Sequence, residues 1–338
     1  MSTARKFKLR FGLRSFLVFI GLISVLLAYF KVTADKQAAI VAEVLDLGGE
    51  VHYDFQCDES GKVDPAGKSA VPQFLLNSLG VDFFHDVTRL RLHNITKTGY
   101  LIEMEGSIHR MVDWENRGFS KRRYDKEAMR NVVSGIATLE SLQYLNMPPV
   151  DDMDGVFIDA VSKLKDLKHL IVLENCDLTD EGFSSLESLK KLKTVSIVDS
   201  KVGDESLVVA GKLKELKILF LSGHVFSDEG VKNLSELKNL HTLVIDGPAP
   251  NETIGLVSWL VGAESKPPKV DSTVSDQGME YLSKLTGLKM LSVRHTLVTD
   301  EFREQFIAKY PKSRMEGFIS KKPKVKNEDA AQEIEDGK

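Results

Sequence analysis

The sequence predicts an α/β solenoid, with parallel strands on one face and helices on the other, behind an N-terminal transmembrane helix. Three observations carry this prediction. A Leu-x-x-Leu-x-x-Leu-x-Leu pattern recurs along the second half of the chain, an aspartate recurs in phase with it, and sixteen consecutive residues near the N-terminus carry no charge. A unit this short cannot bury its apolar side alone, so repeated units must stack.

The first element is an apolar segment with a basic flank. Residues 1–14 hold five Lys or Arg and no acid, and Ser15–Phe30 is the uncharged run. A membrane-spanning helix needs about 20 residues, which the segment supplies if Arg14 and Lys31 extend their charged ends to the headgroups. We therefore expect a transmembrane signal-anchor helix over residues 15–32.

The charge flank predicts the orientation of this helix. Cations that precede a membrane span favour its N-terminus on the cytoplasmic side, so the remainder of the chain is expected outside the cytoplasm. A secretory signal peptide has the same basic head and apolar middle. The alternative is therefore a secreted protein, cleaved near Ala34 after Val32-Thr33-Ala34.

Residues 33–92 are expected to form an α/β cap or linker. Asp35–Leu47 has apolar residues at helical spacing and ends at Gly48-Gly49, while Glu50–Phe55 and Val87–Leu92 alternate as strands do. Pro72–Leu79 is expected to be helical. Residues 93–135 are predicted to hold an insertion followed by a helix.

The repeats are expected over residues 136–312. The pattern begins at the following leucines, with a weaker copy at Ile136: Leu164, Leu189, Leu213, Leu237 and Leu285. The aspartates in phase with it are Asp180, Asp204, Asp228, Asp276 and Asp300, at separations of 24, 24, 48 and 24. The interval of 48 predicts a degenerate repeat over 246–273, with a helix at Ile254–Val261 and a strand at Lys266–Thr273 that Pro267-Pro268 interrupts.

The residues before each of these aspartates fit helix starts. Thr179, Ser227, Ser275 and Thr299 are good N-caps, and an acid in the first helical turn is stabilised by the helix dipole. After the repeats, residues 313–338 are charged and poor in large apolar side chains. We expect this tail to be disordered.

The leucine pattern followed by Thr/Ser-Asp-Glu-Gly resembles that of leucine-rich-repeat proteins. The subtype is similar to short repeats with Cys or Asn after the strand, as in Glu174-Asn175-Cys176. The whole layout resembles bacterial membrane-anchored leucine-rich-repeat proteins, with a specific match over 136–310 and departures at 94–124 and 246–273. The resemblance implies an arc that binds proteins, and it implies no common partner.

Composition and motifs argue against several other functions. The net charge is −4, of which residues 1–32 contribute +6 and the remainder −10. So acidic a domain does not favour nucleic-acid binding, which needs a basic face. No nucleotide-binding, metalloprotease or nucleophile-elbow motif is present, and His85, His169 and His241 are interpreted as cap or surface residues. We predict no catalytic residue, cofactor, metal or small-molecule substrate.

The outward residues of the strands are the candidate protein-binding face. With Leu170 and Val172 facing the core, two rows of outward residues follow. The first is Ile171, Ser196, Phe220, Val244 and Ser292. The second is Leu173, Val198, Ser222, Asp246 and Arg294. Exposed apolar rows often mark interaction surfaces, whereas folding of an insertion over the face would cover them.

The sequence therefore favours a membrane-anchored extracytoplasmic protein that binds a protein partner through its strand face and contacts the bilayer through Ser15–Phe30. Two alternatives stay open. One is a structural envelope protein whose repeats self-associate. The other is an enzyme with a site in residues 50–130.

Overall fold

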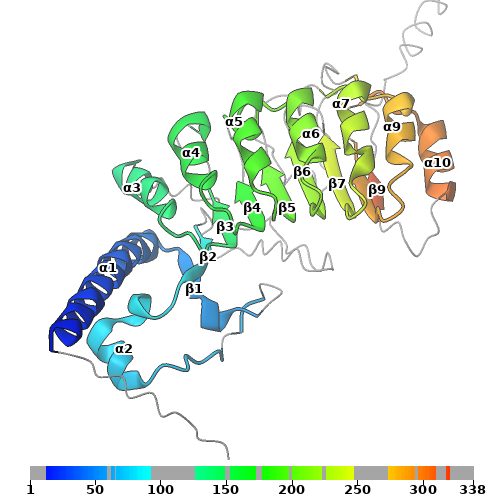
Figure 1. Ribbon diagram of the computed structural model, residues 1–338. Helices are drawn as coiled ribbons and strands as arrows, with labels where there is room; N and C mark the ends of the chain where they lie inside the picture. Colours follow the sequence, from blue (N-terminus) through cyan, green and yellow to red (C-terminus); the bar gives the residue numbers. More distant parts are fainter. Residues whose placement is uncertain are drawn as a thin grey trace, which may run out of the picture.

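The described part of the chain folds into one sheet with its helices stacked beside it (Figure 1). The computed structural model describes residues 13–58, 62–64, 66–92, 126–148, 153–172, 177–197, 200–222, 226–246, 273–293, 296–309 and 317–319. Nine strands follow one another in chain order from β1 to β9. The pair β1·β2 is antiparallel, and every later pair is parallel.

The strands are short and evenly stacked. They are β1 (Glu50–Tyr53), β2 (Val87–Arg91), β3 (Tyr144–Met147), β4 (His169–Val172), β5 (Thr194–Ile197), β6 (Ile218–Ser222), β7 (Thr242–Asp246), β8 (Met290–Ser292) and β9 (Gly317–Ile319). The register is constant across the repeats, so that Leu170, Val195, Leu219, Leu243 and Leu291 lie side by side. A constant register places equivalent side chains over one another.

The helices are α1 (Leu13–Asp46), α2 (Gln73–Leu79), α3 (Lys126–Ile136), α4 (Ile158–Val161), α5 (Asp180–Ser184), α6 (Asp204–Gly211), α7 (Asp228–Lys232), α9 (Asp276–Leu282) and α10 (Asp300–Lys309). Helix α1 precedes β1, and each later helix lies between two successive strands. Single turns of 3-10 helix are η1 (Asp54–Gln56), η2 (Val81–Phe83), η4 (Ser185–Ser188) and η5 (Asn233–Glu236), and η3 (Met153–Phe157) is a π-helical turn.

A single apolar core runs between the sheet and the stacked helices. The leucines of the repeat pattern, from Leu164 to Leu291, are 0–1% exposed and belong to one cluster. Burial of one such side chain contributes about 1.5–3 kcal/mol, so the shared ladder is the main source of stability. The predicted solenoid, with parallel strands on one face and helices on the other, is confirmed.

The helix α1 is continuous from the apolar segment into the cap. Its residues before Ala34 are exposed, whereas Ala34, Gln37 and Val44 are buried. The sequence predicts a membrane helix and a separate helix over Asp35–Leu47. The structure joins them, because no Gly or Pro separates the two segments.

The two strands of the cap begin where the sequence predicts. They end one or two residues earlier than predicted, at Tyr53 and Arg91. The bond from the amide of Val87 to Oε1 of Gln37, at 3.1 Å, fixes the start of β2 against α1. Near the other end of β2, a Cβ built on Gly49 would lie 2.8 Å from both a side-chain carbon of Val44 and the carbonyl of Arg91. A side chain at position 49 would therefore separate α1 from the sheet.

The prediction that a degenerate repeat adds a strand between β7 and β8 is wrong. Thr242 pairs with Met290 and Leu243 with Leu291, so no strand from Lys266–Thr273 lies between β7 and β8. The two helices on either side, α7 and α9, are also in direct contact. Ile254–Val261 lies outside the described residues. The 48-residue interval is thus one repeat with an insertion in its strand-to-helix connection.

A second correction concerns the C-terminal tail. The expected disorder begins at residue 313, but Gly317–Ile319 forms β9 and pairs in parallel with Met290–Ser292. An open sheet edge exposes unpaired amides and carbonyls, and this short apolar segment satisfies those of β8. Residues 320–338 lie outside the described residues.

The repeated aspartate joins each repeat to the next one. Oδ1 of Asp180, Asp204, Asp228 and Asp276 accepts the amide of the residue that caps the following helix, at 2.7–2.8 Å. These capping residues are Gly203, Ser227, Ser275 and Thr299. The sequence predicts only a stabilising charge in the aspartate's own helix. The structure adds a hydrogen-bonded staple between neighbouring repeats.

The N-cap predictions are confirmed, with one variation. Thr179, Ser227 and Ser275 each accept a backbone amide of their own helix. The cap of α6 is Gly203, which has no hydroxyl. There, the hydroxyl of Ser206 reaches Asp180 instead, so the staple keeps a hydroxyl donor at a different position.

Candidate functional site

The outward face of the sheet is the candidate binding face. Ile171, Ser196, Phe220, Val244 and Ser292 lie in register on neighbouring strands, as the alternation predicts. Phe220 and Val244 form a small cluster separate from the main core. These five side chains are only 0–6% exposed, so this row is covered in the structure.

The structure describes only part of the second predicted row. The backbones of Ser222 and Asp246 pair at the ends of β6 and β7. Leu173, Val198 and Arg294 lie outside the described residues. The binding role of either row stays a prediction.

Another outward row, at the strand starts, is more accessible. It comprises Arg89, Tyr144, His169, Thr194, Ile218, Thr242 and Met290. All of them are partly exposed except Thr194. The sequence reasoning missed this row because it began each strand one residue too late. The alternation around Leu170 contained the signal, since His169 and Ile171 share a face.

The strand-start row begins with an unbroken polar and aromatic strip. The guanidinium of Arg89 lies 3.6 Å from the centre of the Tyr144 ring, and the Tyr144 and His169 rings are 5.9 Å apart. Nδ1 of His169 lies 3.0 Å from the hydroxyl of Thr194. Tyrosine and arginine are enriched among the residues that dominate protein interfaces. The strip therefore contains side chains of the kinds found at protein interfaces.

The imidazole of His169 is neutral at physiological pH. Burial, followed by the nearby cations Arg89, Lys193, Lys168 and Lys217, lowers its pKa to about 4. The register places His169 and His241 at different positions of their repeats. His169 pairs with Thr194 on the strand face, whereas the amide of His241 bonds to the carbonyl of Lys217, as that of Lys217 does to Lys193.

Beside this strip, two buried polar atoms have no hydrogen-bond partner within the described ranges. They are Nε of Arg91 and Oδ1 of Asn146, on neighbouring strands in the same register. Buried polar atoms in folded proteins are nearly always satisfied, and each exception calls for an explanation. Both atoms are enclosed by the chain itself, so they give no evidence of contact with another molecule.

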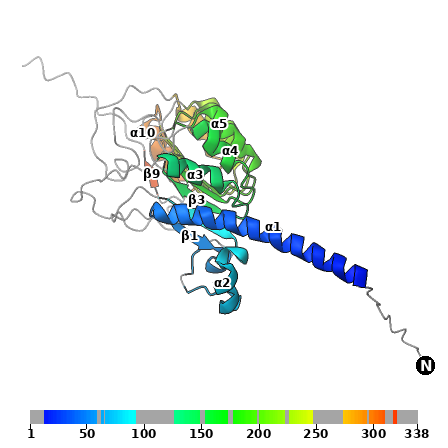
Figure 2. The same cartoon turned by 90° about the vertical axis from the view of Figure 1, so that its left-hand side faces the viewer.

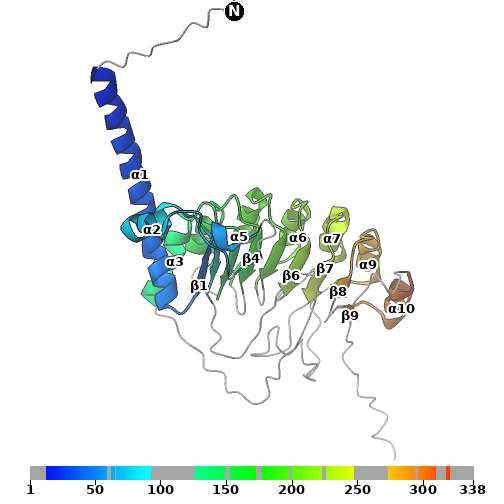
Figure 3. The same ribbon diagram turned by 90° about the horizontal axis from the view of Figure 1, so that it is seen from below.

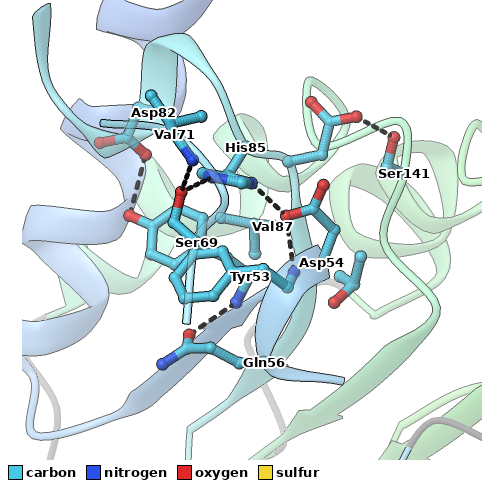
Figure 4. Close-up of polar contacts among 12 residues, drawn as sticks. Tyr53, Asp54, Gln56, Ser69, Val71, Asp82, His85, Val87 and Ser141 are labelled. Carbon is cyan, nitrogen blue, oxygen red and sulfur yellow. Dashed lines mark hydrogen bonds and ion pairs between the residues drawn. The ribbon is translucent and has the colours of Figure 1, made fainter. Parts of the chain in front are cut away.

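The cap holds a polar network centred on His85 (Figure 4). Nε2 of His85 lies 2.6 Å from the hydroxyl of Ser69, and Nδ1 lies 2.7 Å from Oδ1 of Asp54. Figure 4 shows the imidazole between these two groups. The sequence, which separates the three residues by 15 and 16 positions, predicts no such contact.

The same network ties the cap to α1. The side-chain amide of Gln37 donates to Oδ1 of Asp82 and to the carbonyl of His85. The hydroxyl of Tyr53 donates to Asp82 at 3.0 Å. Burial and the adjacent Asp82 both raise the pKa of Tyr53, so its phenol stays protonated as the donor. The network therefore fixes helix α1 to the first strands of the solenoid.

Comparison with known proteins finds similarity only at the level of structure. No protein-family model and no curated protein matches the sequence. Among solved structures, the chain is similar to internalin C2 of Listeria monocytogenes, with 14% identity over 56% of this chain and a TM-score of 0.38. It is also similar to a second Listeria internalin (inlF), with 16% identity over 56% and a TM-score of 0.31.

A third similar structure is a leucine-rich-repeat protein of Leptospira interrogans, with 17% identity over 55% of this chain and a TM-score of 0.34. The matched parts cover 66%, 57% and 50% of those chains, so this chain spans about half to two thirds of their length. The leucine-rich-repeat fold described above rests on the strand register and the buried leucine ladder of the chain itself. The Cys/Asn positions that define the repeat subtype, residues 174–176, lie outside the described residues.

Proposed function

We propose that the chain is a membrane-anchored, extracytoplasmic leucine-rich-repeat protein that binds a protein partner through its strand face. The observation that carries the proposal is the accessible strip of Arg89, Tyr144 and His169 at the strand starts. It contains an arginine and a tyrosine, which are enriched among the residues that dominate protein interfaces. The apolar row with Phe220 and Val244 lies directly beside it but is covered.

The continuity of α1 supports an anchor that is retained. The segment Leu13–Asp46 is one helix with an apolar stretch long enough to span a membrane, and none of that stretch is buried. Cleavage near Ala34 requires an accessible and extended peptide. Ala34 is instead helical and buried, and Gln37 follows one turn later with three hydrogen bonds to the cap. The basic flank then orients the solenoid away from the cytoplasm.

The proposal predicts a loss of partner capture without a loss of folding. In cells that express the full chain, Tyr144→Ala is expected to lower recovery of a crosslinked partner at least tenfold, because truncation of a central aromatic contact typically costs about 2 kcal/mol or more. Val208→Ala is the matched control, since Val208 is exposed on helix α6. Unchanged recovery with Tyr144→Ala, in a protein that remains folded, would contradict the proposal.

Self-association is the alternative outcome of the same experiment. If the only species recovered is the chain itself, and its mass in detergent rises with concentration, the envelope-structural function replaces the proposed one. Tyr144→Ala then lowers the mass at a fixed concentration instead of lowering partner recovery.

A second candidate function has one observation in its favour. Ser69, His85 and Asp54 are connected in the order that activates a serine nucleophile, with the imidazole accepting the hydroxyl proton and the carboxylate orienting the imidazole. The hydroxyl of Ser69 also accepts the amide of Val71 at 3.0 Å. That bond gives Ser69 a structural role as well, in the loop that precedes α2.

A fluorophosphonate probe separates the two roles of Ser69. If the triad is only structural, the full chain in detergent incorporates no more probe than Ser69→Ala. If the triad is catalytic, labelling is lost in both Ser69→Ala and His85→Gln. The control Ser78→Ala keeps it, because the hydroxyl of Ser78 bonds to the carbonyl of Phe74 within α2.

A further inference from the structure

The two long edges of the solenoid carry opposite charges. The connections from helix to strand occupy residues 163–168, 188–193, 212–217, 236–241 and 284–289, and together they contain twelve lysines and three carboxylates. The helix starts on the other edge occupy residues 178–181, 202–205, 226–229, 274–277 and 298–301. These segments contain nine carboxylates and no Lys or Arg. We call the lysine-rich side the basic edge.

Most lysines of the basic edge are exposed and not neutralised. Three of the twelve pair with a carboxylate within the ranges the structure describes: Lys163 with Asp159, Lys191 with Asp166, and Lys212 with Glu187. Lys190, Lys214, Lys238 and Lys289 are exposed. Three lysines of this edge, Lys168, Lys193 and Lys217, contribute after burial and Arg89 to the lowered pKa of His169. The edge thus carries an excess of positive charge in four of its five segments.

The membrane helix points past this same edge. Gln37 of α1 bonds to the amide of Val87 at the start of β2, whereas Val44, two turns later, lies against the end of β2 near Leu92. The helix α1 therefore runs in the direction of the parallel strands. Its exposed part, before Ala34, extends beyond the strand starts. Figures 2 and 3 show this part projecting from the end of the row of repeats, across the direction of the row.

The distance along α1 from the end of its apolar stretch to the sheet places the basic edge next to the lipid headgroups. Lys31 follows the uncharged run, and Gln37, which lies level with the strand starts, is six positions further along the helix. Six residues of helix rise about 9 Å. The headgroup layer adds about 5–8 Å to each side of the hydrocarbon core, and lysine side chains span the remaining gap. Attraction to a charged surface persists over about 8 Å in physiological salt.

We propose that the basic edge binds the anionic lipid headgroups of the membrane that α1 spans. The inference rests on the proposed anchor. Contact along several repeats holds the long axis of the solenoid parallel to the bilayer. The opposite, acidic edge, at which β2 and β7 end, then faces away from the membrane. The strand face is presented sideways, to partners at the membrane surface.

Lysine acetylation of the reconstituted full chain tests this inference. The chain is placed as single copies in nanodiscs of phosphatidylcholine alone or with about a third phosphatidylglycerol, and an uncharged acetylating reagent is applied. We expect Lys190, Lys214 and Lys238 to react at least fivefold more slowly in the anionic membrane, and this protection to disappear in 1 M salt. Lys201 and Lys232, which pair with Asp177 and Glu229 at the other side of the repeats, are the internal controls and should react equally in both membranes.

Equal rates for the edge lysines in the two membranes overturn the inference, as does protection of Lys201 and Lys232 instead. A charge-reversed variant, with Lys190→Glu, Lys214→Glu and Lys238→Glu, is expected to lose protection of Lys289 as well. Failure of the chain to stay in the nanodisc after an alkaline wash contradicts the proposed anchor itself. Stable insertion with equal rates contradicts only the lipid contact.

Discussion

Leu219→Ala is expected to lower the free energy of unfolding by about 2–5 kcal/mol. The side chain of Leu219 is 0% exposed, and its neighbours in register, Val195 and Leu243, are equally buried. Truncation opens a cavity that cannot collapse, because the strands on both sides hold the backbone spacing. Urea unfolding of the full chain in non-ionic detergent, followed by circular dichroism, measures the loss.

Leu297→Ala is the matched control for this measurement, since the side chain of Leu297 is 51% exposed. It should change the free energy of unfolding by less than about 0.5 kcal/mol. If both substitutions have the same small effect, the ladder of shared leucines is not what holds the solenoid together.

The second large effect is expected at the junction that spans the insertion. The carboxylate of Asp228 accepts the amide and hydroxyl of Ser275 and the amide of Gly278, at 2.8, 2.6 and 2.9 Å. Asp228→Ala leaves these donors without their charged acceptor, at a cost of about 2–3 kcal/mol. Hydrogen exchange of α9 and α10 is the sensitive measurement, because each repeat is stabilised mainly by its neighbours.

Glu229→Ala controls for charge at the same helix start. Glu229 is exposed and pairs with Lys232 at the surface, and exposed ion pairs contribute little. Asp228→Asn keeps one acceptor oxygen. Its exchange rates in α9 and α10 should lie between those of Asp228→Ala and Glu229→Ala. Equal exchange rates in Asp228→Ala and Glu229→Ala would show that the staple does not couple the repeats on either side of the insertion.

The leucine ladder could be predicted because its residues recur at a regular spacing in the sequence. A residue such as Leu219 is recognisable from its spacing alone, and stacking is the only arrangement that buries a periodic apolar side. The staple from Asp228 to Ser275 could not be predicted in this way. Its two ends lie 47 residues apart, and the local pattern around Asp228 is fully explained by capping within its own helix.

The degenerate repeat shows how a period can mislead. The interval between Asp228 and Asp276 is twice the repeat length, yet β7 pairs directly with β8. Strand register is set by the buried faces of the paired strands. An insertion in the connection from strand to helix changes neither face, so its length is unconstrained and carries no information about the number of repeats.

The candidate site was only partly accessible to sequence reasoning. The alternation predicted correctly which strand residues face outward, such as Ile171 and Phe220, but not how far they are covered. The contacts of Arg89 with Tyr144, and of His85 with Ser69 and Asp54, join residues whose spacing has no period. Such contacts follow from the packed structure alone.

Photo-crosslinking in intact cells tests the proposed strand-face function most directly. A photoreactive amino acid is placed at Ile218 or Met290, which are partly exposed on the strand face, and at Val208 on the opposite, helical side. We predict a discrete adduct with a second protein from Ile218 and Met290 and none from Val208. Adducts from Val208 alone, or no adduct from any of the three positions, would contradict a protein-binding role for the strand face.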